Sequence, residues 1–146
     1  MADYHDSEIE FRYPDGWELI QDEVDGDPSV TVQRDGAFWT ATILKSRPAV
    51  EDVLSQATDA FREEYDELDV YESQAPLCGE KHPFREIEFF AVDLVNRVWL
   101  RALRNGRFTL FIMAQATDHE CEELSPIFDA ITASLAIVSD DDKLIN

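Results

Sequence analysis

The chain has 146 residues, 45% of them hydrophobic, which is enough for one domain with an apolar core. Its 32 Asp and Glu against 12 Lys and Arg give a net charge of −20, which excludes a surface suited to nucleic acid or anionic membranes. No run of 18 apolar residues and no signal-peptide pattern is present. We expect a single cytoplasmic domain over residues 1–146, with flexible ends at 1–7 and 139–146.

Two explanations fit the negative charge. One is a basic protein partner that meets an acidic surface. The other is adaptation to a salty cytoplasm, where counterions screen the repulsion between carboxylates. The scarcity of lysine agrees with the second explanation, since only three are present, Lys45, Lys81 and Lys143.

The first part of the chain is rich in strand and turn signals. Alternating apolar and polar residues predict strands over 9–13, 17–21, 29–34 and 37–45. Pro14-Asp15-Gly16 predicts a turn, so residues 11–17, FRYPDGW, predict a β-hairpin with aromatic residues on both sides. Residues 22–28 are acidic and predict a loop, and Asp35-Gly36 predicts a two-residue hairpin turn.

Two helices and four more strands are predicted in the rest of the chain. Apolar residues at three- and four-residue spacing predict a helix over 49–65. Further strands follow over about 69–74, 84–93, 96–104 and 107–116, and Asn105-Gly106 predicts a hairpin turn between the last two. A final helix begins near 118, where Thr117 and Glu120 predict a capping box. Ser125-Pro126 predicts a break in it near 125.

The order ββββ-α-ββββ-α predicts an α+β fold with a mainly antiparallel sheet. Phe108, Leu110 and Ile112 should point to one side of their strand, and Phe111 and Met113 to the other. Because both faces carry bulky apolar residues, we expect a helix on each face. The expected architecture is a three-layer α-β-α sandwich.

The same pattern resembles a known fold superfamily. The aromatic first strand, the YPDGW turn, SVTVQ, the helix after a strand, the long meander and the final IFDAITASL are similar to PsbP-like proteins. That superfamily includes the Ran-binding MOG nuclear-import factors and bacterial DcrB-like proteins. The resemblance extends from Phe11 to about Ile137 and implies an α-β-α sandwich whose members mostly bind partners. It transfers no functional residue, because its matching positions are structural.

Two groups of residues carry side chains that can bind a metal. Cys78, His82, His119 and Cys121 supply zinc-ligand types, but three strands separate the two pairs and place them roughly 25–30 Å apart. The same separation opposes a disulfide, whose Cα atoms lie within about 7 Å. We therefore predict two free cysteines, no bound metal and no cofactor.

The acidic loop is the second possible metal site. It carries Asp22, Glu23, Asp25 and Asp27, and such oxygen ligands can bind Ca²⁺. The EF-hand pattern fails here, because Gly26 is the fifth residue and Gln33 the twelfth. A solvated turn is the favoured interpretation.

Four arginines crowd the third and fourth of the later strands: Arg97, Arg101, Arg104 and Arg107. A tight turn at Leu94-Val95 would place Glu88 opposite Arg101 and Phe90 opposite Trp99. The second hairpin would place Leu110 on the other side of Arg101. The face then shared is the predicted binding site, made of Glu86, Glu88, Arg97, Trp99 and Arg101. These residues fit two interpretations, a set of structural cross-strand ion pairs or a groove that grips an acidic peptide or small anion.

No catalytic motif accompanies these residues, and His5, His82 and His119 fall in predicted loops or at a helix start. We therefore expect a non-catalytic module that binds another protein, with no nucleic acid or membrane partner. The alternative is a small-ligand-binding or hydrolytic protein that uses a groove around Trp99 and Arg101.

Overall fold

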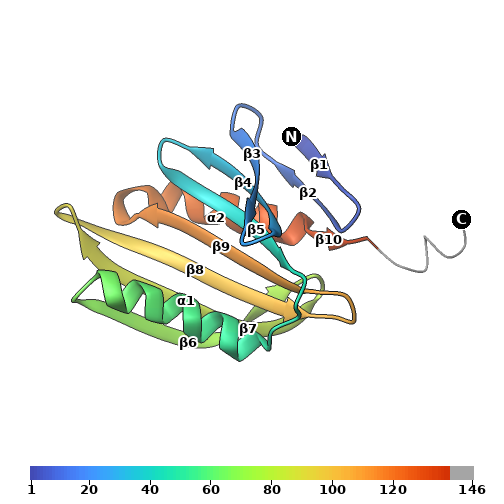
Figure 1. Ribbon diagram of the computed structural model, residues 1–146. Coiled ribbons are helices and arrows are strands. Elements are labelled where there is room, and N and C mark those ends of the chain that lie inside the picture. Colours follow the sequence, from blue (N-terminus) through green and yellow to red (C-terminus); the bar gives the residue numbers. More distant parts are fainter. Residues whose placement is uncertain (139–146) are drawn as a thin grey trace, which may run out of the picture.

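The structure is a computed structural model that describes residues 1–138. Within this range the chain forms ten strands and two helices (Figure 1). Their bounds are β1 Ala2–His5, β2 Ile9–Tyr13, β3 Glu18–Val24, β4 Asp27–Arg34, β5 Ala37–Leu44, α1 Val50–Glu64, β6 Leu68–Leu77, β7 Glu80–Ala91, β8 Leu94–Arg104, β9 Thr109–Thr117, α2 Asp118–Ser134 and β10 Ala136–Ile137.

The strands form two antiparallel sheets. Seven strands pair in the order β3-β4-β5-β9-β8-β7-β6, and three pair in the order β1-β2-β10. The β4–β5 hairpin of the large sheet turns at Asp35-Gly36 with positive φ at both residues, as the sequence predicts. The predicted α+β class with an antiparallel sheet is confirmed.

The two helices pack on opposite faces of the large sheet. The side chains of β8 show this, because they point alternately toward one helix and the other. Val98 and Leu100 belong to the cluster under α1, whereas Trp99 and Leu103 belong to the cluster on the side of α2. The three-stranded sheet also packs on the α2 side, where β2 contacts α2 (Figure 1). The strand pattern therefore buries two apolar clusters, one on each face.

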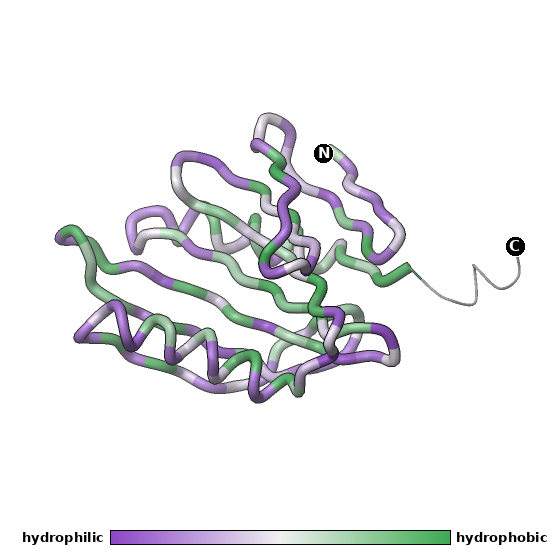
Figure 2. Tube along the Cα trace, in the orientation of Figure 1, coloured by the Kyte–Doolittle hydropathy of each residue, from purple (hydrophilic) through white to green (hydrophobic). Residues whose placement is uncertain are grey.

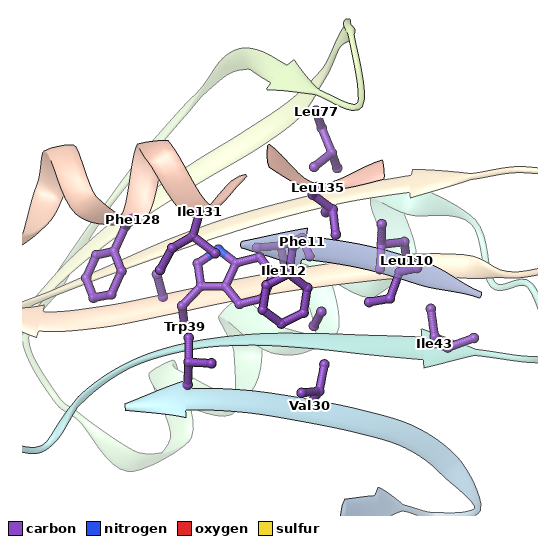
Figure 3. Packing of buried hydrophobic residues seen from close by; sticks show 14 of the residues in the cluster. Phe11, Val30, Trp39, Ile43, Leu77, Leu110, Ile112, Phe128, Ile131 and Leu135 are labelled. Atoms are coloured by element: carbon purple, nitrogen blue, oxygen red, sulfur yellow. The ribbon is translucent and has the colours of Figure 1, made fainter. Parts of the chain in front are cut away.

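Trp39 lies at the centre of the larger cluster (Figure 3). Its side chain is fully buried, and its ring centroid lies 4.7 Å from that of Phe11 in β2. The indole N–H donates a 3.0 Å hydrogen bond to Thr132 Oγ1 in α2. A buried indole needs such an acceptor, so Trp39 joins both sheets to the helix.

The predicted FRYPDGW hairpin is wrong. Pro14-Asp15-Gly16 does form a turn, with the Trp17 N–H donating to the Pro14 carbonyl at 3.3 Å and a φ of 87° at Gly16. The turn carries the chain from one sheet to the other, because β2 pairs with β1 and β10 whereas β3 pairs with β4. Both edges of β2 are already occupied, so it has no edge left for β3.

The prediction of an acidic loop over 22–28 is also wrong, because this segment forms a β-hairpin. β3 continues to Val24, which pairs with Asp27, and the turn consists of Asp25 and Gly26 with φ values of 52° and 86°. Asp-Gly favours a two-residue hairpin turn, but the many neighbouring carboxylates led to the prediction of a solvated loop. The strand pairing therefore extends through most of the segment assigned to a loop.

α2 runs without the predicted break near Ser125. The capping box of Thr117 and Glu120 forms as expected, but Pro126 lies inside the helix. Leu124 and Phe128, on either side of the proline, are both buried against the sheet. Packing of this continuous stripe therefore outweighs the backbone hydrogen bond that proline cannot donate.

The ends of the chain and of the large sheet have distinct features. Residues 2–5, in the segment expected to be flexible, form β1 and pair with β2. The other expected flexible end, 139–146, lies outside the described residues. The large sheet ends in β3 and β6, and both of these edge strands expose several carboxylates, among them Asp22, Glu23, Asp69 and Glu72.

The link between Trp39 and Thr132 can be tested by a double-mutant cycle. Trp39→Phe should lower the free energy of unfolding by about 1–3 kcal/mol, because a donor and part of the ring are lost. Combination with Thr132→Val should reveal a coupling of about 1 kcal/mol in urea unfolding. Thr58→Val is the control, since Thr58 is also buried and bonded to the carbonyl four residues earlier, but in α1. Equal coupling to Thr58 would contradict a specific link.

Candidate functional site

The predicted site lies on β7 and β8, which pair in a register different from the expected one. The turn consists of Val92 and Asp93, with φ of 53° and 61°, and not of Leu94-Val95. Glu88 consequently pairs with Arg97 and not with Arg101, and Trp99 pairs with Glu86 and not with Phe90. The shift is by an even number of residues, so the residues predicted to share a face still share it.

The β8–β9 hairpin also has a register different from the predicted one. Arg101 pairs with Ile112, whereas the sequence predicted Leu110. The loop spans four residues, because the Asn105 side chain accepts the backbone N–H groups of Arg107 and Phe108 at 2.7 and 2.9 Å. A polar side chain that bonds the backbone in this way replaces the two-residue turn that Asn-Gly usually forms.

Trp99 and Arg101, the centre of the predicted groove, lie beneath α2. The Trp99 indole N–H donates to Glu86 Oε1 at 2.8 Å, and its ring packs on Phe128 of α2. Arg101 donates to the Pro76 carbonyl at 2.9 Å and to Asp129 of α2 at 3.2 Å. Burial lowers the pKa of Arg101, and its side chain is only 14% exposed.

The space left between Trp99, Arg101 and α2 is a cavity of about 20 Å³. Such a volume accommodates about one water molecule. The structure therefore brings the predicted residues together, but it fills the groove between them with the side chains of the helix. In this arrangement Arg101 clamps α2 to the sheet.

The other two charged residues of the predicted site, Glu88 and Arg97, lie at the margin of α2. Arg97 pairs with Glu88 at 3.4 Å and with Asp118, at the start of α2, at 3.0 Å. Both side chains are about one-third exposed. Beyond them, toward the β7–β8 hairpin, side chains on this face are exposed.

The uncovered part of this face carries two exposed aromatic rings among carboxylates. Tyr71 and Phe90 are 50% and 56% exposed. Strand pairing places Glu86 opposite Tyr71 and Glu88 opposite Asp69. We call this surface the acidic aromatic face, defined by Asp69, Tyr71, Glu86, Glu88 and Phe90.

The negative potential of the acidic aromatic face affects the pKa of Tyr71. Glu88, followed by Asp69, raises the pKa of Tyr71, because a tyrosinate would be repelled by these carboxylates. Arg97 opposes this shift only partly. The surface therefore favours positively charged groups.

A cleft of about 450 Å³ opens at the end of this face. It lies between the segment that follows α1 and the β7–β8 hairpin, and its walls combine acidic and apolar side chains: Asp66, Glu67, Leu68, Asp69, Glu88, Phe89, Phe90 and Val95. Beyond the cleft, Val92 at the hairpin tip is 92% exposed. The tip lies at the far left of Figure 1 and carries hydrophobic colour in Figure 2.

Sequence reasoning placed Glu86 and Glu88 on the correct face but missed Tyr71 and Phe90. In the observed register both rings lie on the α2 side of the sheet, where an aromatic side chain is usually buried. Their exposure depends on which strands α2 covers, and no local pattern contains that information. One sequence feature could have indicated this exposure: Tyr71 lies close to two acidic residues of the same strand, Asp69 and Glu72.

The cysteines and histidines do not converge. Cys78 lies in the β6–β7 turn and Cys121 in α2, and both thiols are free. Among residues 1–138 no group of three or more His, Cys, Asp or Glu has the arrangement of a metal site. No helix in this range is long and apolar enough to span a membrane.

Comparisons with known proteins find similarity in fold only. No family model matches the chain, and no curated protein matches it significantly. Among solved structures, cyanobacterial PsbP (CyanoP) from Synechocystis is 14% identical and superposes with a TM-score of 0.61, over 93% of this chain and 91% of that one. The chain has a PsbP-like fold.

Two further structures share the PsbP-like fold. LpqN of Mycobacterium tuberculosis, involved in cell envelope biogenesis, is 18% identical with a TM-score of 0.56, over 90% of this chain and 83% of that one. A Bacteroides thetaiotaomicron protein is 12% identical with a TM-score of 0.60; the match covers 91% of this chain and 46% of that one. At these identities the likeness establishes the fold alone.

The structural role of Arg101 predicts a loss of stability when it is replaced. Arg101→Leu should lower the free energy of unfolding by about 1–3 kcal/mol, because two hydrogen-bond acceptors lose their charged donor. Arg104→Leu is the matched control in the same strand, since Arg104 is exposed, and its effect should stay within about 0.5 kcal/mol. Urea unfolding measures both. Equal effects of the two substitutions would contradict the clamp.

The partly buried thiol of Cys78 predicts a pH-dependent reactivity. Burial raises its pKa to about 11, because the thiolate is disfavoured away from water. In a Cys121→Ser variant, alkylation by iodoacetamide at pH 8 should be about a hundredfold slower than in an unstructured cysteine peptide. The rate should continue to rise up to about pH 11, beyond the point where the peptide has levelled off. A plateau near pH 9 would show that Cys78 is not shielded.

Proposed function

We propose that this chain is a non-catalytic interaction module that binds a basic segment of another protein on the acidic aromatic face. The observation that carries the proposal is the exposure of Tyr71 and Phe90 among uncovered carboxylates, next to a cleft of about 450 Å³. Aromatic residues are enriched where proteins bind one another. A contact of this kind would remove both rings from water.

The chemistry of the face selects the charge of the partner. A lysine or arginine that enters the cleft would lie against Phe90 while its charge meets Asp66, Glu67 or Asp69. A cation over an exposed aromatic ring gains roughly 0.5–1 kcal/mol, and its long aliphatic stem covers apolar surface. The net charge of −20 would accelerate the encounter with such a segment.

The hairpin tip supports the proposal independently. Val92 has a φ of 53°, a conformation that costs an L-residue roughly 1–2 kcal/mol and that is rare for a β-branched side chain. Asparagine or glycine would suit this turn position better. Since the Val92 side chain is 92% exposed, it adds nothing to the core, and contact with a partner accounts for its presence.

Two finer features belong to the same proposal. The fold is a three-layer α-β-α sandwich, a description supported by the contacts of α1 with β7 and β8 and of α2 with β8 and β9. The location is cytoplasmic, which agrees with the free thiols of Cys78 and Cys121. The cavity of about 20 Å³ between Trp99 and Arg101 gives no support to a ligand-binding or hydrolytic groove at that position.

Substitutions at the tip and on the face should separate binding from folding. Phe90→Ser should weaken capture of the partner at least tenfold, as expected of a hot-spot aromatic residue losing about 1.4 kcal/mol or more. Val92→Asn should also weaken capture while leaving the free energy of unfolding equal or higher. Val24→Ser is the control, because Val24 is exposed to a similar degree, 53%, on the opposite edge of the sheet. The measurement is quantitative recovery of the same protein from native cell extract by each tagged variant.

A charge-reversal pair tests whether the partner is basic. Asp69→Lys and Asp22→Lys change the net charge equally, but only Asp69 belongs to the acidic aromatic face. NMR shift mapping with a synthetic peptide of alternating Arg and Leu should show perturbations centred on Tyr71 and Phe90, which Asp69→Lys removes and Asp22→Lys preserves. Perturbations spread evenly over the acidic surface, or equal losses in both variants, would refute the proposed site.

A further inference from the structure

A second large cavity lies far from the acidic aromatic face, between the two sheets. It has a volume of about 460 Å³, within the range of roughly 300–1,000 Å³ typical of small-molecule sites. One wall is the face of β3, β4 and β5 on which Gln21, Val30 and Ile43 lie, and the other is the β1–β2 connection. We call this cavity the inter-sheet pocket.

The inner wall of the inter-sheet pocket is apolar. It is formed by core residues whose exposed fractions are only 1–4%: Ile9, Val30, Ala41, Ile43 and Phe108. Val30 and Ile43 lie on neighbouring strands at one end of the core (Figure 3). A ligand that reaches this wall would extend the existing core.

Most of the charged groups around the pocket are already bound. Asp6 accepts the Tyr4 hydroxyl at 2.6 Å and the backbone N–H groups of Glu8 and Ile9 at 2.7 and 2.9 Å. The carboxylate of Glu8 is paired with Arg107. Hydrogen bonds from neutral donors hold the Asp6 carboxylate at the β1–β2 connection but leave its charge in place, whereas Arg107 compensates the charge of Glu8.

Two charged residues at the mouth remain. Asp22 follows Gln21 on β3, so strand alternation directs its side chain toward the other face of the sheet, and its Oδ1 accepts the Glu23 N–H at 2.7 Å. Lys45 follows β5 on the exposed surface, and its ammonium forms no ion pair with any of residues 1–138. Lys45 therefore offers a cation at the mouth that no carboxylate of residues 1–138 pairs with, on a surface that is otherwise acidic.

We propose that the inter-sheet pocket binds a small amphiphilic anion. Its apolar body would lie against Val30, Ile43 and Phe108, and its acidic head would meet the Lys45 ammonium. Gln21, whose amide group donates one N–H to the Tyr4 hydroxyl at 3.1 Å, has a second amide N–H at the mouth for the same head. This site is independent of the acidic aromatic face, and a ligand here would also bridge the two sheets.

Three probes that share an eight-carbon alkyl chain and differ in their head group test whether the inter-sheet pocket selects an anion. Octanoate should give saturable NMR shifts at Val30, Ile43 and Lys45, whereas octylammonium and 1-octanol should bind about two- to fivefold more weakly because neither brings an anion to Lys45. Equal binding of the three probes would refute the anionic head group. Octanoate shifts located elsewhere, or none up to its critical micelle concentration, would refute the pocket itself.

Variants locate the site without disturbing the core. Lys45→Met should weaken octanoate binding about two- to fivefold, the effect of losing one exposed ion pair, while Lys81→Met, a substitution of another exposed lysine, should not. Gln21→Trp should abolish saturable binding by covering the mouth from an exposed edge-strand position. Unchanged affinity in both Lys45→Met and Gln21→Trp would overturn the proposal. Phe90→Ser should leave octanoate binding intact, so failure here is distinct from failure of the protein-binding function.

Discussion

The hydrogen bond between Trp39 and Thr132 is the interaction on which the arrangement of the molecule depends. Trp39 belongs to β5 of the large sheet, its ring contacts Phe11 of the small sheet, and its indole N–H donates to Thr132 of α2. Three parts of the chain therefore meet at one fully buried side chain. Burial of an unpaired indole N–H would be costly, which restricts where α2 can lie. Held there, α2 covers β8, β9 and the Leu77 end of β6, and it leaves Tyr71 of β6 and Phe90 of β7 exposed on that side. The exposure of Tyr71 and Phe90 is therefore a consequence of how the core is closed.

The arginines of this acidic chain serve mainly as clamps between elements. Arg85, whose side chain is only 11% exposed, donates to Ser55 and Thr58 of α1, and Arg101 holds α2. The planar guanidinium suits such positions, because it can satisfy several acceptors at once. With these cations engaged inward, the surplus carboxylates dominate the surface. The arginine-rich hairpin that resembles a binding groove in the sequence is therefore a joint between sheet and helix.

Local patterns predicted the elements well and their spatial partners less well. α1, the β4–β5 hairpin and the α2 capping box follow from spacing and turn chemistry within a few residues of one another. The register of β7 and β8 did not, because the turn uses Val92, a residue that turn preferences disfavour. Likewise β2 has the alternation of a hairpin strand, but its neighbours come from both ends of the chain. The closed groove at Arg101 and the open face at Tyr71 depend on helix placement, which only tertiary packing determines.

The carboxylates on the two edge strands of the large sheet have a consequence for how copies of the protein behave together. A free edge offers unpaired backbone groups to any other strand, and β3 and β6 are both free edges among the described residues. Repulsion between Asp22 and Glu23 on one copy, and Asp69 and Glu72 on another, opposes head-to-tail growth of a continuous sheet. The same surplus charge that attracts a basic partner thus keeps the protein dispersed, and acidification toward the isoelectric point near 4.2 would remove both effects together.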